Sequence, residues 1–181
     1  RVVYQDLVRV NKAISDRNLA KNPVLTEALD FALANKKDVH LIGLLSDGGV
    51  HSHINHLKGL LTAAENFGVK EKYIHAFTDG RDVDPKSGKA FIEEIIDHAE
   101  KTNSKLATVI GRYFAMDRDK RWDRVEKAYL CLTEGTGKLA DSPLEAIRNS
   151  YKEGVTDEFV LPTVIRNAAR EYAHIPAATA S

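Results

Sequence analysis

The sequence has only one cysteine, one methionine and one tryptophan among its 181 residues. A lone thiol cannot form an internal disulfide, so the chain fits a reducing compartment, and Cys131, which lies among apolar residues, is expected to serve packing. The sequence also lacks an apolar run long enough to span a bilayer, and its first residues lack the charged-then-apolar order of a signal peptide. These absences favour a cytoplasmic protein without a membrane partner.

A surplus of either charge is also missing, because 26 basic and 26 acidic residues give a formal net charge of +0 at pH 7. Nonspecific affinity for nucleic acid or anionic lipid depends on a basic surface, so neither partner is expected. Any site for an anion must therefore be local. With 43% hydrophobic residues, the chain can bury the core of one ordinary globular domain.

Three strand–loop–helix units follow one another along the chain. The expected strands are residues 39–45, 73–77 and 106–110, and each precedes a polar loop and then a helix with apolar residues at helical spacing. This order predicts an α/β fold with a mainly parallel sheet flanked by helices, in a single domain. The first strand is apolar enough to be buried on both faces.

Other elements are predicted from end signals and periodicity. A helix should begin after Asn22-Pro23 and stop near Asn35, and another should end near Gly68. A capping box in residues 142–145 should begin a helix that stops at Gly154. Residues 159–165 are expected to form a further strand, and the apolar stripe that starts at Trp122 is expected to lie in the core.

Polar side chains follow each of the three predicted strands. Ligands of open α/β sheets bind at the carboxyl ends of the strands, where the loops meet helix N-termini. The loops bring to that edge six polar side chains: His51, His53, Arg81, Asp82, Arg112 and Arg118. We therefore expect one site for a small ligand.

The residue types indicate what that ligand would be. Guanidinium groups donate paired hydrogen bonds to carboxylate or phosphate, so the arginines predict a small ligand with two or three negative charges. Asp82 would be a poor phosphate ligand but a good partner for a hydroxyl whose proton moves. Gly48 and Gly49 would let the backbone approach the ligand, and His51 can donate to an anionic oxygen.

Each feature also has a purely structural interpretation. The Asp79–Asp82 stretch, taken alone, is more typical of a turn, and residues 117–121 are typical of a solvated charged face. His51, His53 and His56 do not match a zinc pattern, so no metal is expected in this chain. His40, His75 and His98 are expected to serve structure.

Three of these segments carry a family resemblance. Residues 46–53 (SDGGVHSH), 75–82 (HAFTDGRD) and 111–119 (GRYFAMDRD) resemble signature segments of the cofactor-independent phosphoglycerate mutases, in the same order. Residues 155–159 (VTDEF) resemble a fourth. The resemblance covers residues 1–165, which we interpret as the substrate-binding (phosphotransferase) domain, whereas residues 166–181 form a tail of uncertain origin.

The resemblance implies a function. In that family this domain is inserted into a phosphatase-like domain that holds two Mn²⁺ ions and a serine nucleophile, and the enzyme interconverts 3-phosphoglycerate and 2-phosphoglycerate without added 2,3-bisphosphoglycerate. His51, Arg81, Asp82, Arg112 and Arg118 would contact substrate, with Asp82 as the catalytic acid or base. The chain would be one domain excised from a glycolytic isomerase that is expected to be a monomer. Because it lacks the serine and metal motifs, we expect the chain to be inactive alone. A stand-alone module that binds small phosphorylated or carboxylated anions remains the alternative.

Overall fold

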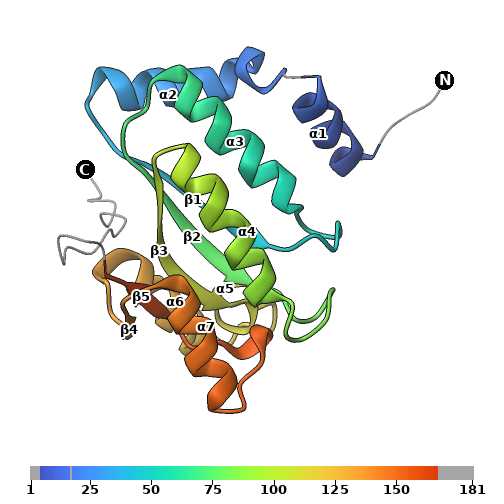
Figure 1. The fold of residues 1–181 in the computed structure, drawn as a ribbon, viewed down its shortest axis with the longest axis vertical. Coiled ribbons are helices and arrows are strands. Elements are labelled where there is room, and N and C mark those ends of the chain that lie inside the picture. Colours follow the sequence, from blue (N-terminus) through green and yellow to red (C-terminus); the bar gives the residue numbers. More distant parts are fainter. Residues whose placement is uncertain (1–4, 17, 167–181) are drawn as a thin grey trace.

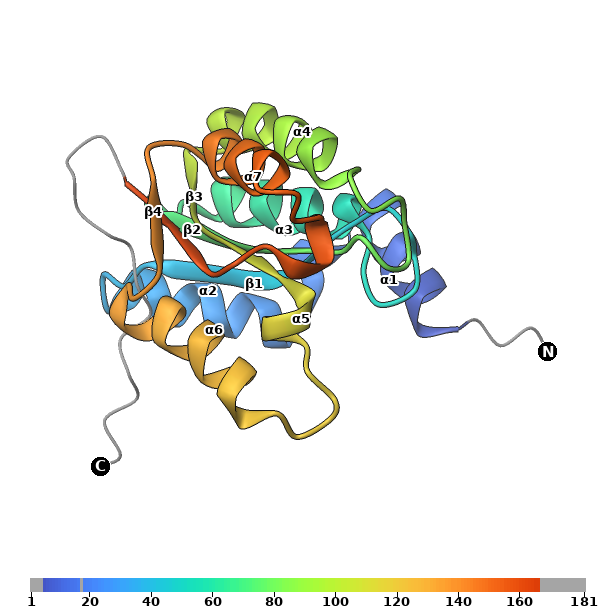
Figure 2. The same cartoon turned by 90° about the horizontal axis from the view of Figure 1, so that it is seen from below.

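The computed structural model describes residues 5–16 and 18–166. It shows a five-stranded sheet with helices on both faces (Figures 1 and 2). The elements, in chain order, are α1 (Asp6–Ser15), η1 (Leu19–Lys21), α2 (Pro23–Ala34), β1 (Val39–Leu45), α3 (Ile54–Phe67), β2 (Lys72–Thr78), α4 (Gly88–Lys101), β3 (Ser104–Gly111), α5 (Arg112–Ala115), α6 (Trp122–Glu134), β4 (Lys138–Ala140), α7 (Pro143–Lys152), η2 (Asp157–Phe159) and β5 (Thr163–Ile165).

The sheet has the strand order β1-β2-β3-β5-β4. The first three strands pair in parallel, which confirms the fold class predicted from the three repeated units. Strand β5 runs antiparallel to β3, and β4 runs parallel to β5, so the sheet is mixed. Parallel pairing aligns the carboxyl ends of β1, β2 and β3, and the loops that follow them therefore meet at one edge.

The two faces of the sheet are covered by different helices. Helices α3, α4 and α7 lie on one face, and α2, α5 and α6 lie on the other (Figure 2). The larger core cluster joins α3, α4 and α7 to the sheet through fully buried residues such as Leu61, Ile92 and Ile147. The second cluster, under α5 and α6, includes Cys131, whose burial raises the pKa of its thiol to about 12, as expected of a packing residue.

The helix ends follow the predicted signals. The Asn22 side chain accepts hydrogen bonds from the first turn of α2, and Gly68 ends α3 in the left-handed conformation at φ 95°. Ser142 caps α7 by accepting from the Glu145 N–H at 3.1 Å. Helix α1, which packs beside α3 in Figure 1, and strand β4 were not predicted from the sequence.

The predicted strand at residues 159–165 is only partly correct. Residues 163–165 form β5, whereas residues 157–159 form the 3₁₀ turn η2. Pro162 lacks the N–H that a central strand would use, and the chain before it crosses the ends of β2 and β3 instead of pairing along them. The tail prediction falls mostly on residues 167–181, which lie outside the described part.

Two burial predictions were not fully correct. Ala128 of the predicted stripe is buried beside Cys131, but Trp122 is 71% exposed and Tyr129 is 55% exposed, because they lie outside the face that α6 turns toward the sheet. Strand β1 lies at the sheet edge and Ile42 is 50% exposed, so β1 is not buried on both faces.

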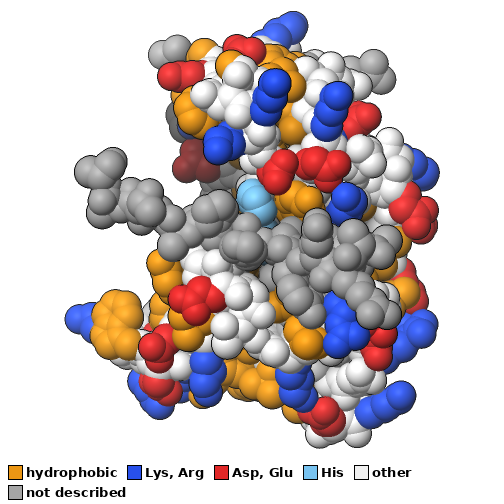
Figure 3. All heavy atoms as spheres, turned by 90° about the vertical axis from the view of Figure 1, so that its left-hand side faces the viewer, with side chains coloured by type: hydrophobic (Ala, Val, Ile, Leu, Met, Phe, Trp, Pro, Cys, Tyr) orange, Lys and Arg blue, Asp and Glu red, His pale blue; other side chains and the backbone are white. Residues whose placement is uncertain are grey.

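The surface carries charges of both signs. Acidic and basic side chains are interspersed over the face drawn in Figure 3, in keeping with the net charge of zero. Within residues 5–16 and 18–166, no helix is long and apolar enough to cross a membrane.

Two histidines, with Thr108, form a chain of side-chain contacts across β1, β2 and β3. The His40 Nδ1 lies 2.9 Å from His75 Nε2, and the His75 Nδ1 lies 3.0 Å from the Thr108 hydroxyl. His75 and Thr108 are fully buried, and the pair of rings is stacked. Burial, together with the neighbouring His40, lowers the pKa of His75 to about 4. The structural role expected for these histidines is thus supported by their contacts.

This histidine pair should make stability depend on pH. Above pH 6.5 His75 is neutral in both the folded and the unfolded chain, so its contribution is complete. As the pH falls from 6.5 towards 4, His75 becomes protonated in the unfolded chain but stays neutral in the folded chain. The free energy of unfolding should therefore fall by on the order of 3 kcal/mol. Urea unfolding at a series of pH values measures this loss. His75→Gln should flatten the dependence in that window, and parallel curves for both proteins would contradict the assignment.

Candidate functional site

The structure brings the predicted site residues to one cavity. His51, Arg81, Asp82, Arg112 and Arg118 all line a hollow of about 540 Å³ at the carboxyl ends of the parallel strands. Further residues that line it are Tyr113, Met116, Asp117, Asp119, Arg124 and Glu158. His53, which the sequence also placed near this edge, instead caps α3 by accepting from the Asn55 N–H at 3.1 Å.

The turn after β2 is built on the buried carboxylate of Asp79. One oxygen, Oδ1, accepts from the backbone N–H groups of Arg81 and Asp82 at 3.2 and 3.0 Å. Gly80, which lies between Asp79 and Arg81, has φ +64°, which a residue with a side chain adopts at a cost. The stretch is thus a stabilised turn, as the structural interpretation predicted, and it carries two residues that line the cavity.

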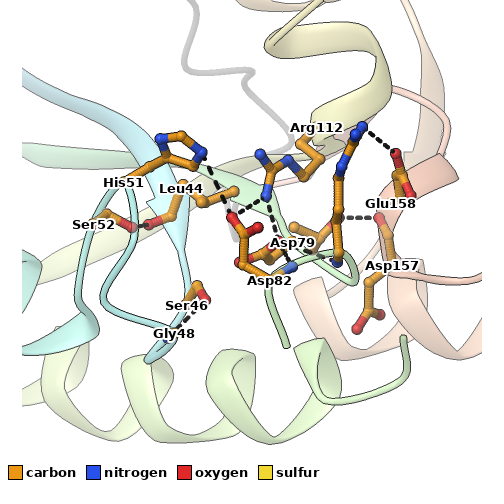
Figure 4. Close-up of polar contacts among 12 residues, drawn as sticks. Leu44, Ser46, Gly48, His51, Ser52, Asp79, Asp82, Arg112, Asp157 and Glu158 are labelled. Carbon is orange, nitrogen blue, oxygen red and sulfur yellow. Dashed lines mark hydrogen bonds and ion pairs between the residues drawn. The ribbon is translucent and has the colours of Figure 1, made fainter. Parts of the chain in front are cut away.

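Arg112 begins α5, directly after β3, and reaches across to the turn after β2 (Figure 4). Its Nη1 donates to Asp79 Oδ1 and to Asp82 Oδ2, both at 2.6 Å. Burial of Asp79 opposes its ionisation, but hydrogen bonds from the Asp82 N–H and from Arg112 outweigh burial and lower its pKa. The arginine is thus fixed by two carboxylates, one buried and one facing the cavity.

The loop after β1 delivers His51. The Ser52 hydroxyl donates to the Leu44 carbonyl at 2.6 Å, and the Gly48 N–H donates to the Ser46 hydroxyl at 3.1 Å. A Cβ on Gly48 would lie 3.3 Å from the Asp82 carbonyl, so the two loops are in close contact there. His51 Nε2 consequently lies 3.6 Å from Asp82 Oδ2 (Figure 4).

The Arg118 loop is held by a carboxylate that the sequence did not single out. Residues 117–121 were expected to form a solvated charged face, but the Asp117 side chain is only 1% exposed. Its Oδ2 accepts from the Arg121 N–H at 2.8 Å, and its Oδ1 pairs with Arg124 at 3.3 Å. The Arg124 guanidinium lies 3.9 Å from the centre of the Tyr113 ring. Arg118 itself is exposed and has no ion-pair or hydrogen-bond partner among the described residues.

The segment after α7 completes the cavity. Glu158 lines it and its Oε1 lies 3.6 Å from Arg81 Nη1, while the neighbouring Asp157 is fully buried. The sequence marked residues 155–159 only as a signature, without a site role. No local pattern in the sequence marks a site role for this segment, because that role depends on how the segment packs against the ends of β2 and β3.

No metal site emerges from the described residues, where no group of three or more His, Cys, Asp or Glu side chains is placed to hold an ion. His56 Nε2 bonds instead to Asn11 Oδ1 at 2.6 Å. What the cavity offers is four guanidinium groups, an imidazole and four carboxylates, of which Asp82 faces both His51 and Arg112. Such a set can bind a small anion at two ends and can exchange a proton with a hydroxyl between them.

Comparison with known proteins gives consistent matches. The family model described as BPG-independent PGAM N-terminus matches residues 10–179. The 2,3-bisphosphoglycerate-independent phosphoglycerate mutase of Flavobacterium psychrophilum is 53% identical over 165 residues, 91% of this chain and 33% of that protein. The enzyme of the same name from Clostridium novyi is 53% identical over 176 residues, 97% of this chain and 34% of that protein.

A solved structure agrees with these matches. A crystal structure of Leishmania mexicana phosphoglycerate mutase, determined at low cobalt concentration, superposes with a TM-score of 0.88 at 31% sequence identity. The match covers 96% of this chain and 33% of that one. The chain therefore spans about a third of the length of the curated relatives it matches.

The close approach at Gly80 can be tested by adding one methyl group. A Cβ there would lie 2.8 Å from both the Asp157 Cβ and the Glu158 N, in addition to the strain of a positive φ. Gly80→Ala should lower the free energy of unfolding by about 3 kcal/mol. Gly154→Ala is the matched control, because its φ is +75° and nothing lies within 4 Å, so only about 1 kcal/mol should be lost. Equal losses in urea unfolding would show that residues 157–158 do not press on this turn.

Proposed function

This chain belongs to the BPG-independent phosphoglycerate mutase family, and from that membership we propose that it is the substrate-positioning domain of an enzyme that interconverts 3-phosphoglycerate and 2-phosphoglycerate. The observation that carries the proposal is the cavity in which His51, Asp82 and three arginines converge from the connections that follow β1, β2 and β3. Phosphoglycerate bears a carboxylate, a phosphate and one free hydroxyl. The cavity offers a partner for each of these groups.

Binding falls to Arg81, Arg112, Arg118 and His51. Arginine suits the two anionic ends of phosphoglycerate, because its planar fork donates two hydrogen bonds to one carboxylate or phosphate. Arg118 is the most available of them, since it is exposed and no described carboxylate pairs with it. Arg112 already spans Asp79 and Asp82, so its position is set before a ligand arrives.

Proton transfer falls to Asp82. When a phosphoryl group leaves one glycerate oxygen, that oxygen must gain a proton, and when the other hydroxyl receives the group, it must lose one. A carboxyl group beside both oxygens can donate the first proton and accept the second, so that no net proton is consumed. Asp82 Oδ2 faces His51 and Arg112 at the cavity wall, where such a substrate would lie.

The phosphoryl acceptor would lie outside this chain. By resemblance, a serine on a phosphatase-like domain takes the phosphoryl group and returns it, and that domain holds two Mn²⁺ ions. The described residues provide no group for a metal ion, so the proposal assigns none to this domain. Metal ions in such a site would supply positive charge around the transferred group. The part of this chain is to hold the glycerate and to handle its hydroxyl protons.

Replacement of Asp82 tests the proton-transfer role in a full-length enzyme that carries this domain. Asp82→Asn keeps the size and one hydrogen-bonding oxygen but removes the group that takes up a proton. Turnover should fall about a hundredfold or more, with a smaller change in KM. Asp97→Asn, an exposed aspartate of α4, is the control and should leave both constants unchanged. Near-normal turnover of the Asp82 variant would remove the assigned role.

The chain alone should bind weakly and not catalyse. Phosphoryl transfer depends on a positioned nucleophile and concentrated positive charge, and the proposal places both in the other domain. With Mn²⁺ and 3-phosphoglycerate, the purified chain should form no 2-phosphoglycerate above background. NMR titration should show weak, salt-sensitive binding that Arg112→Ala weakens further. Activity that persists through repurification and is lost on Asp82→Asn would show that the division of labour is wrong.

A further inference from the structure

The segment at residues 155–160 crosses the carboxyl ends of β2 and β3 and is bonded to both. The Thr78 hydroxyl donates to the Asp157 carbonyl at 2.6 Å, and the Gly111 N–H donates to the Val160 carbonyl at 2.8 Å. A Cβ on Gly111 would lie 2.6 Å from the Val160 N, so the backbones are in direct contact. This segment therefore has a fixed position relative to the two strands that carry Asp82 and Arg112.

The Asp157 side chain anchors this segment to α4 and α7. It is fully buried, and its Oδ2 accepts from the Gly88 N–H at 2.7 Å, at the first turn of α4. Its Oδ1 accepts from the Tyr151 hydroxyl of α7. Burial raises the pKa of Asp157, although the hydrogen bonds from Tyr151 and Gly88 oppose that shift. The anchor is thus a single carboxyl group shared by α4, α7 and the segment itself.

The adjacent side chain points the other way, toward the cavity. Figure 4 shows the Asp157 and Glu158 side chains pointing in opposite directions. Glu158 lines the cavity, and its Oε1 lies 3.6 Å from Arg81 Nη1. The Glu158 side chain is 20% exposed, whereas that of Arg81 is 52% exposed. Among the described residues, Glu158 is the acidic group that pairs with Arg81, while Arg112 has two such partners. The orientation of the Arg81 guanidinium therefore depends on one contact.

From this geometry we propose that Glu158 is a positioning residue that holds the Arg81 guanidinium over the cavity before the anion binds. The choice of 3-phosphoglycerate as the ligand rests on the proposed function, whereas the contact between Glu158 and Arg81 does not. A long side chain that is half exposed has many rotamers, and restricting them in advance lowers the entropy that binding must overcome. The charge of Glu158 acts in the opposite sense, since a carboxylate weakens the attraction of Arg81 for an anion. At this exposure solvent screens that repulsion, so positioning is the larger effect.

The two effects predict opposite outcomes for one substitution. Glu158→Gln keeps the size of the side chain and removes its charge and its ion pair. If Glu158 positions Arg81, the dissociation constant for 3-phosphoglycerate should rise about two- to fivefold, the range for an exposed pair. Unchanged or tighter binding would overturn the proposal. Glu153→Gln is the matched control, because Glu153 is an exposed glutamate paired with Lys138 away from the cavity.

A second arm separates positioning from other roles of Glu158. In an Arg81→Ala background, Glu158→Gln should change the affinity little, because the side chain to be positioned is gone. An equal loss in both backgrounds would show that Glu158 acts on something other than Arg81. An unchanged backbone amide spectrum outside residues 79–82 and 155–160 would show that each variant folds.

A third arm does not depend on the ligand. NMR relaxation of the Arg81 Nε–Hε group in the ligand-free chain should show that Glu158→Gln increases the mobility of this group. Glu153→Gln should leave that mobility unchanged. If the chain binds no 3-phosphoglycerate, the proposed function fails, yet this measurement still decides the contact. Equal mobility of Arg81 in all three proteins would overturn the positioning role even if the ligand binds.

Discussion

The buried carboxyl group of Asp157 joins the segment at residues 155–160 to the first turn of α4 and to α7. A polar group without water must have its bonds satisfied within the protein, and Asp157 meets this condition through α4 and α7. Gly80 and Gly88 leave room for the Asp157 side chain, because a Cβ on either would lie 2.8 Å from Asp157 atoms. The turn that carries Arg81 and Asp82 therefore rests on a residue that lies more than seventy positions later in the sequence.

This arrangement explains which parts of the structure could be predicted from the sequence. The parallel strands, the helix caps and the convergence of His51, Asp82 and Arg112 follow from local patterns and from the rule that parallel strands align their ends. The contacts of Asp157 could not be predicted, because they depend on backbone that approaches from elsewhere in the chain. Asp117 bonds to residues close to it in the sequence, but the mixed charges of residues 117–121 do not indicate that its side chain is buried. The exposure of Trp122 was missed for a related reason: helical spacing marks a possible apolar face, but the sheet decides which face is covered.

The charges in the cavity are balanced rather than uniformly positive. Four arginines and four carboxylates line it: Arg81, Arg112, Arg118, Arg124, Asp82, Asp117, Asp119 and Glu158. Their fields largely cancel at a distance, so long-range attraction of anions contributes little, and selectivity must come from the directions of the donors. Most of these guanidinium groups are already held by carboxylates. An incoming anion therefore meets donors whose orientation has been set by the fold, and it must take the place of a carboxylate or use the donors that remain.

The exposure of Trp122 determines what the intrinsic fluorescence of this chain can report. Trp122 is the only tryptophan, it is 71% exposed, and it begins α6 directly after the loop that carries Arg118. Its indole is in contact with water in the folded chain, so its emission should change little when the core unfolds. The same emission should respond to whatever covers the N-terminal end of α6. Tryptophan emission is thus a poor optical probe of folding in this chain and a sensitive one of contacts at that end of the helix.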